Sequence, residues 1–265
     1  MKFKILFIVF VGLIIFSSLV LLFLPFGVLG SDYAFSFWSS NWYLLLLLAV
    51  LLIVLVVFYT KNRRMFSYLE EENWDNLLVL LYDSIINKNK LKYDDIKLFI
   101  LLSVLKNRFD YISELSLLLS HKPVLKDAFC IELGLPYIKS QDPDIIIPYY
   151  KDITVKQKGR LRDWAGWFYI YGILLTGDYT LAKQELLSLL SYARESIVVL
   201  LALYNLNAFS GTDKEIADFV SKHKKSFKED VKKEKIFKLI EKEKADIYVL
   251  MMSGLIQDSV EWIFA

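Results

Sequence analysis

The stretch GDYTLA, Gly177–Ala182, separates two apolar segments with helical spacing and sets the expected fold of most of the chain. Its glycine and acidic residue mark a turn, and the tyrosine begins the next segment. This aromatic position recurs, because Trp74 and Phe109 are 35 residues apart and Phe109 and Tyr179 are 70 residues apart. A fixed period of this length is typical of stacked pairs of helices.

The same step predicts further turns near positions 144 and 214. Thr212–Ala217 parallels Gly177–Ala182 without the aromatic residue, and Pro143–Ile147 keeps an apolar residue at the matching offset. An apolar helical segment precedes each of four turns: Ile96–Leu105, Val124–Ile138, Trp164–Leu175 and Ile197–Phe209. Helix, turn and second helix at a regular interval predict an all-α solenoid.

Gly177–Ala182 resembles the turn and second-helix start of a tetratricopeptide repeat, which has Gly, an acidic residue, Tyr, two variable positions and Ala. Thr212–Ala217 is similar. The resemblance covers about Met65–Ser226 and implies a TPR-like α-solenoid of helix-turn-helix repeats that binds other proteins. It also implies that the first helix of each repeat lines a concave surface.

Two long charge-free runs precede this region. Ile5–Ser31 and Tyr33–Thr60 contain no charged residue, and Asp32 alone separates them. About 20 apolar residues are enough for a helix to cross a bilayer, so we expect a transmembrane helical hairpin with helices at about 5–25 and 42–60. A cleaved signal peptide is the alternative for the first run, but its apolar part is longer than such signals need.

Basic residues flank the pair of runs on both sides: Lys2, Lys4, Lys61, Arg63 and Arg64. The connecting loop Gly27–Asn41 contains none. Lysine and arginine near span ends favour the cytoplasmic side. The sequence therefore predicts a multi-pass protein of the inner (cytoplasmic) membrane with both termini in the cytoplasm, and periplasmic placement of the repeat domain is the alternative.

The chain divides into three expected parts: a membrane anchor over residues 1–64, a repeat domain over 65–226, and C-terminal helices over 227–265. The last helix, about Ala245–Phe264, has one broad apolar face and is expected to cap the final repeat. The net charge of +2 gives no general attraction to nucleic acid.

Motifs of enzyme chemistry are missing from the sequence. It has no phosphate-binding Gly-Lys-Ser/Thr loop, no HExxH and no paired-cysteine metal spacing, and His121 and His223 are far apart. We therefore expect no catalytic residue, no cofactor, no metal site and no small-molecule substrate. The single cysteine, Cys130, cannot form an internal disulfide.

One expected first helix carries the candidate partner-binding residues. Its aromatic side chains include Trp164, Trp167 and Tyr171, and basic residues bracket its start: Lys151, Lys156, Lys158, Arg160 and Arg162. Exposed aromatic residues could anchor a protein partner, and the basic residues could hold an acidic segment or a terminal carboxylate. The alternatives are that the aromatic residues are core and the basic ones a solvated linker.

These patterns together predict a membrane-anchored scaffold that binds a protein partner at the bilayer, within a multiprotein envelope assembly such as a flagellar motor collar. The expected partners are one or more proteins, through the helical repeats, and the lipid bilayer, through residues 5–60. The alternative is a regulatory or structural subunit of an integral membrane complex, such as a transporter or channel.

Overall fold

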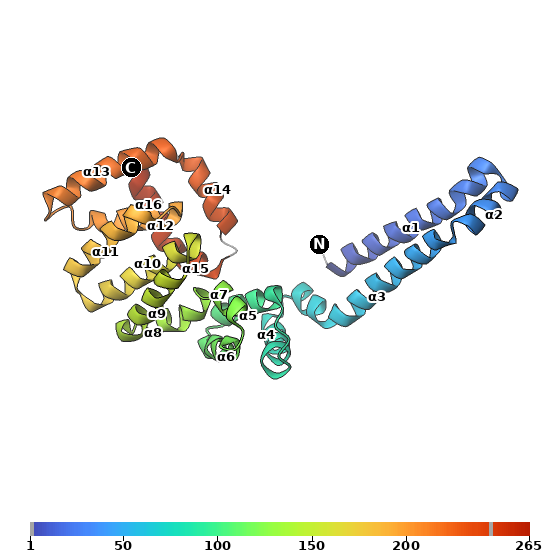
Figure 1. Ribbon diagram of the computed structural model, residues 1–265, viewed down its shortest axis with the longest axis horizontal. Coiled ribbons are helices and arrows are strands. Elements are labelled where there is room, and N and C mark those ends of the chain that lie inside the picture. Colours follow the sequence, from blue (N-terminus) through green and yellow to red (C-terminus); the bar gives the residue numbers. More distant parts are fainter. Residues whose placement is uncertain (1–2, 244–245) are drawn as a thin grey trace. The chain divides into compact units, whose positions relative to one another are not determined.

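A computed structural model describes residues 3–243 and 246–265 of the chain (Figure 1). The described residues are 84% helical and contain no β-strand, which confirms the expected all-helical class. The chain forms two compact units, Met1–Leu81 and Tyr82–Ala265. Of the residues used to predict orientation, Lys2 lies outside the described part.

The first unit contains the two longest apolar helices. Helix α1 covers Phe3–Leu29 and α3 covers Trp42–Glu70, and they lie side by side with the short helix α2, Ser31–Ser40, at one end (Figure 1). Both are long and apolar enough to cross a membrane, α1 over Val9–Val28 and α3 along its length. Almost none of their apolar residues is buried inside the protein.

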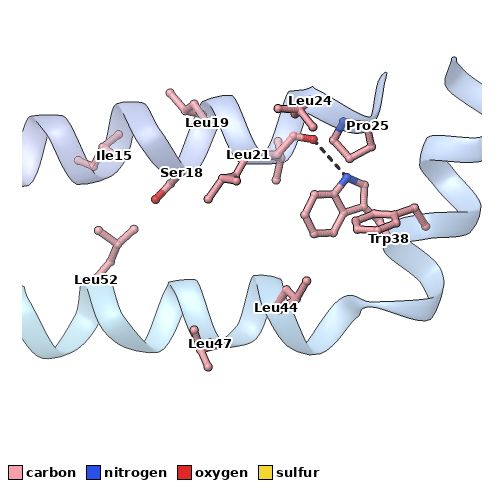
Figure 2. Close-up of a pocket in the computed structure, with 12 residues that line it drawn as sticks. Ile15, Ser18, Leu19, Leu21, Leu24, Pro25, Trp38, Leu44, Leu47 and Leu52 are labelled. Carbon is pink, nitrogen blue, oxygen red and sulfur yellow. Dashed lines mark hydrogen bonds between the residues drawn. The ribbon is translucent and has the colours of Figure 1, made fainter. Parts of the chain in front are cut away.

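The connection between these helices is helical, whereas the sequence suggested a loop over Gly27–Asn41. Gly30 separates α1 from α2 with a φ of 80°, which glycine adopts without steric cost. The indole Nε1 of Trp38 donates a hydrogen bond to the carbonyl of Leu22, 3.2 Å away (Figure 2). This bond ties α2 to the end of α1.

An apolar crevice of about 560 Å³ lies between α1 and α3. Figure 2 shows Ser18 of α1 and Leu52 of α3 pointing into the space between the two helices. The Ser18 hydroxyl donates to the Ile14 carbonyl of its own helix at 2.6 Å. The crevice therefore presents an almost wholly hydrocarbon surface.

Helix α3 continues past the expected end of the second span near residue 60. It includes Lys61 and Arg64 and ends at Glu70, so the expected boundary after Arg64 falls inside a helix. Glu72 then has a φ of 51°, which breaks the helical path. Asn73 accepts a hydrogen bond from the Asn76 N–H at 3.2 Å and caps the next helix.

The second unit is a succession of short helices. They are η1 (Asp83–Asn87), α5 (Tyr93–Leu105), α6 (Phe109–Leu119), α7 (Pro123–Ala128), η2 (Glu132–Gly134), α8 (Leu135–Ser140), α9 (Pro143–Lys156), α10 (Gly159–Thr176), α11 (Tyr179–Tyr192), α12 (Ser196–Asn207), α13 (Lys214–Asp230), α14 (Lys233–Glu243), α15 (Ile247–Met251) and α16 (Ser253–Phe264). Helix α4 (Trp74–Tyr82) precedes them in the chain and belongs to the first unit except for its last residue. Helices thus begin at or beside each position of the 35-residue spacing.

Three of these helix starts are capped in the same way. Asp142, Asp178 and Asp213 each accept a hydrogen bond from a backbone N–H two or three residues further on, at 2.9–3.1 Å. Such a bond satisfies an N–H that has no partner within the helix. The acidic residue of the spaced turns therefore has a local physical role.

Neighbouring helices of the second unit pack closely. Helix α10 lies between α9 and α11, and α12 packs against α11, α13 and α16 (Figure 1). A Cβ at Gly172 would lie 2.8 Å from a methyl carbon of Ile146, so only glycine lets α9 and α10 approach this closely. Trp164, Trp167 and Phe168 fill the centre of this packing.

The expected helix Val124–Ile138 is wrong, because the structure breaks it into α7, η2 and α8. Pro136 stands at the start of α8, where proline is tolerated, and it cannot continue a helix from before Gly134. At the break, Tyr149 and Tyr150 donate hydrogen bonds to the carbonyls of the buried residues Cys130 and Ile131.

The expected last helix, Ala245–Phe264, is also corrected: Ala245 lies outside the described residues, and the remainder divides at Met252 into α15 and α16. Helix α16 packs against α12 and α13, and Lys224 Nζ donates to the Trp262 carbonyl at 2.7 Å. Helix α15 instead contacts α5, and its Tyr248 ring meets Trp164 edge-on with centroids 4.9 Å apart.

Candidate partner-binding cleft

An open cleft of about 700 Å³ lies between the start of α10 and the connection from α11 to α12. We call it the basic cleft because four of its lining residues are cationic. Its lining is Lys158, Gly159, Arg160, Arg162, Asp163, Ser191, Tyr192, Ala193, Arg194 and Glu195. Three of the six predicted partner-binding residues therefore line one cleft.

Asp163 fixes the two walls of the basic cleft to each other. Its carboxylate is 2% exposed and accepts hydrogen bonds from the backbone N–H groups of Arg194, at 2.8 Å, and Glu195, at 3.1 Å. A buried carboxylate needs such partners to offset the loss of water. Asp163 therefore holds the α11–α12 connection against α10.

Arg162 is held in the basic cleft by an aromatic ring. Its guanidinium carbon lies 3.9 Å from the centroid of the Tyr192 ring, a cation–π contact. Tyr192 in turn lies over Gly166, where an added Cβ would be 2.7 Å from the tyrosine hydroxyl oxygen. Glycine one turn after Arg162 thus makes room for the ring that supports the guanidinium.

Arg160 is engaged within the protein. Its guanidinium forms ion pairs with Asp246 at 2.7 Å, Glu243 at 3.1 Å and Glu195 at 3.5 Å. Asp246 also pairs with Lys97 of α5 at 2.8 Å. Its charge joins α10 to α12 and to the ends of α14 and α15, and contact of Arg160 with a partner stays a prediction.

The pKa values of the carboxylates around Arg160 are shifted in different directions. Burial alone would raise the pKa of Asp246, but hydrogen bonds from Lys97 and Arg160 hold it below its usual value. Burial raises the pKa of Glu195 and of Glu243, and the attraction of Arg160 only partly opposes it. Asp246 is consequently the carboxylate that this cluster keeps most firmly charged.

A further buried carboxylate lies near the same cluster. Glu132 Oε2 is inaccessible to solvent and has no hydrogen-bond partner among the described residues. Burial raises the pKa of Glu132 to about 7, with a smaller contribution from Asp246 in the same direction. Burial also raises the pKa of the neighbouring Cys130 thiol to about 12, so this thiol is neutral at physiological pH.

The predicted aromatic anchors do not line the basic cleft. Trp164 and Trp167 are 0% and 1% exposed, which makes them core residues and leaves no surface for a partner in this conformation. Tyr171 is half-buried, and Lys158 is an exposed residue of the cleft lining. The expectation of exposed tryptophan anchors is corrected, because α10 is covered on more than one side.

Sequence reasoning missed the second wall of the cleft. Tyr192, Arg194 and Glu195 lie on the α11–α12 connection and were not considered as site residues. The 35-residue spacing contained the signal, since it relates Arg160, in the first turn of α10, to Glu195, at the start of α12. Among the residues that the structure describes, no group of three or more His, Cys, Asp or Glu side chains could hold a metal ion.

A protein family described as "Uncharacterised Treponema protein" matches residues 112–265, more than half of the chain, and the chain belongs to this family. A relative described as an uncharacterized protein of Treponema pallidum (strain Nichols) is 22% identical over 158 residues. That match covers 56% of this chain and 48% of the relative, so the chain spans about half the length of this curated relative. No solved structure matches the chain. The family match includes every residue of the basic cleft.

Proposed function

We propose that this protein is a membrane-anchored scaffold whose helical domain binds a protein partner at the cytoplasmic face of the membrane. The observation that carries the proposal is the open basic cleft, because several of its cations have no ion-pair partner among the described residues. The domain that contains this cleft follows two helices of membrane length in the chain. Tethering one binding surface to a bilayer raises its effective concentration for other components there.

The anchor is proposed to be a transmembrane hairpin formed by α1 and α3. Only 6% and 0% of their apolar windows are buried inside the protein, which is unlike the core helices of a soluble domain. Both helices pair their backbone groups internally, as lipid requires. The basic residues Lys61, Arg63 and Arg64 near the end of α3 support cytoplasmic placement of the helical domain.

The helical domain is proposed to be a TPR-like α-solenoid. Support comes from helices that begin at Trp74, Phe109, Pro143, Tyr179 and Lys214, close to a constant interval, and from acidic caps at three of these starts. Repeats of this kind share a continuous core with their neighbours. We propose α16 as the C-terminal cap, because it packs on α12 and α13.

We propose that this scaffold is part of a multiprotein envelope assembly, such as a flagellar motor collar. A regulatory or structural subunit of a transporter or channel is the second candidate. The apolar crevice between α1 and α3 favours it, since a few side chains of a further transmembrane helix could fill that space. One observation opposes the subunit candidate: the Ser18 hydroxyl already donates a hydrogen bond within α1 and so has no free donor for another helix.

Site-specific photocrosslinking in the full-length protein, in native membranes, tests the proposal. A crosslinker at Lys158 or Arg194 is expected to give a discrete protein adduct, while one at the exposed Lys222 of α13 gives none. If crosslinkers at Leu47 or Leu52 gave adducts to another membrane protein, and crosslinkers in the cleft gave none, the subunit alternative would be supported instead. No adduct from Lys158 or Arg194 would contradict the scaffold proposal.

A further inference from the structure

We propose that the basic cleft binds an acidic peptide segment, whose side-chain carboxylates are held by Arg162 and Arg194, with the exposed Lys158 as a third cation of the lining. This inference rests on the proposed function and names the chemistry of the partner. The partner segment is expected to carry at least two carboxylates, because the two arginines come from different elements that line the cleft: Arg162 from α10 and Arg194 from the α11–α12 connection.

The charges in the cleft leave cations without internal partners. Asp163 is satisfied by two backbone N–H groups, and Glu195 faces Arg160. Among the described residues, no carboxylate pairs with Lys158, Arg162 or Arg194, and Lys158 and Arg194 are exposed. The cleft therefore presents an excess of positive charge to any ligand, which favours an anionic segment.

Arg162 is positioned to bind a carboxylate. Its guanidinium is stacked on Tyr192, and its buried Nε has no hydrogen-bond partner among the described residues. A guanidinium that is already ordered loses less side-chain entropy when a ligand binds, and its planar fork matches the two oxygens of a carboxylate. Arg162 is thus an ordered contact, while Arg194 is an exposed one.

The N-terminus of α10 adds to the positive electrostatic potential of the basic cleft. Lys158 is the residue before this 18-residue helix and provides no side-chain cap, so the first N–H groups of α10 are not bonded by a capping side chain. Helix N-termini carry partial positive charge. In contrast, Asp163 occupies the N–H groups just before α12. The N-terminus of α10 and the cations Lys158, Arg162 and Arg194 therefore all line the basic cleft.

The lining favours a peptide over other anions. Tyr192 is the one aromatic residue in the described lining, and its ring already holds the Arg162 guanidinium, which disfavours a stacked nucleobase. A space of about 700 Å³ is far larger than an inorganic ion, and most of the lining side chains are charged or polar, which does not suit a lipid chain. A polar chain with spaced carboxylates fits both the size and the charge.

Fluorescence anisotropy with the full-length protein in detergent micelles tests this inference. The probe is a fluorescein-labelled decapeptide that alternates glutamate and glycine, and the matched control peptide replaces glutamate by glutamine. We expect the acidic probe to bind, and each of Arg162→Gln and Arg194→Gln to weaken binding about tenfold or more, as expected for loss of a charge-assisted hydrogen bond. Lys222→Gln, on exposed α13, is expected to bind like wild type.

Equal binding of the acidic probe by wild type and by Arg194→Gln would overturn the inference. Because Arg194 is exposed, that variant keeps the test valid even where Arg162→Gln disturbs folding. Displacement of the probe by millimolar inorganic phosphate, or by vesicles of anionic lipid, better than by unlabelled acidic peptide would also overturn it. Photocrosslinks from the cleft without binding of the acidic probe would leave the scaffold proposal standing and refute only the carboxylate chemistry.

Discussion

Replacing Glu132 by glutamine is expected to stabilise the protein at alkaline pH and to have little effect in acid. Glu132 Oε2 is buried without a hydrogen-bond partner among the described residues, and burial raises the pKa of this carboxyl to about 7. Asp246 adds to the shift, while Lys97 and Arg160 oppose it. The folded protein thus prefers the neutral acid, which glutamine imitates in size and polarity.

The expected magnitude depends on the difference between folded and unfolded pKa values. An unfolded glutamic acid titrates near its ordinary pKa of 4.5. Between that pH and about 7 the folded state holds a proton that the unfolded state has lost, so stability falls as pH rises. The loss is complete above pH 7 and amounts to about 3 kcal/mol, at about 1.4 kcal/mol per pKa unit.

Urea unfolding of the full-length protein in detergent, followed by tryptophan fluorescence, to which the buried Trp164 and Trp167 contribute, measures this effect. We expect Glu132→Gln to exceed wild type by about 3 kcal/mol at pH 8 and to match it near pH 4.5. Glu234→Gln, a matched change at an exposed carboxylate of α14, provides the control. A difference between Glu132→Gln and wild type that does not depend on pH would refute the reasoning.

Gly166→Ala is expected to lower the free energy of unfolding by about 1–3 kcal/mol, because its Cβ would meet the Tyr192 hydroxyl oxygen at 2.7 Å. Urea midpoints check this against Gly211→Ala, whose Cβ would meet nothing within 4 Å; equal midpoints would contradict the packing. Asp163→Ala leaves the Arg194 and Glu195 N–H groups unpaired and should cost about 2–3 kcal/mol in the same assay, whereas Asp163→Asn, which keeps an acceptor, should cost less. Asp178→Ala removes the cap of α11 and should cost about 1 kcal/mol, with Asp178→Asn near wild type; a loss as large in Asn as in Ala would exclude the capping role.

The sequence was sufficient for local features of the fold. Charge-free runs predicted the positions of α1 and α3, and the spaced turns predicted where α4, α6, α11 and α13 begin, because caps and apolar periodicity depend on neighbouring residues. The break between α7 and α8 was missed. Its signals, Gly134 and Pro136, are present in the sequence, but the tyrosines that donate to the buried carbonyls at the break come from α9.

The candidate site was only partly predictable. Lys158 and Arg162 were identified from their place at the start of a helix, but the partners of Arg160 lie more than 30 residues further along the chain, in Glu195, Glu243 and Asp246. Trp164 and Trp167 could not be assigned to core or surface from their pattern, because α10 is apolar around its whole circumference. Tertiary contacts, rather than local preferences, decided each of these roles.

The most direct test of the account is the position of the helical domain relative to the membrane. Single cysteines at Ser39 in α2 and Lys222 in α13, both exposed, would be treated in intact cells with a membrane-impermeant maleimide. Native Cys130 is buried and is expected not to react. The account predicts labelling at position 39 in intact cells and labelling at position 222 only after the membrane is permeabilised. Labelling at position 222 in intact cells would contradict it.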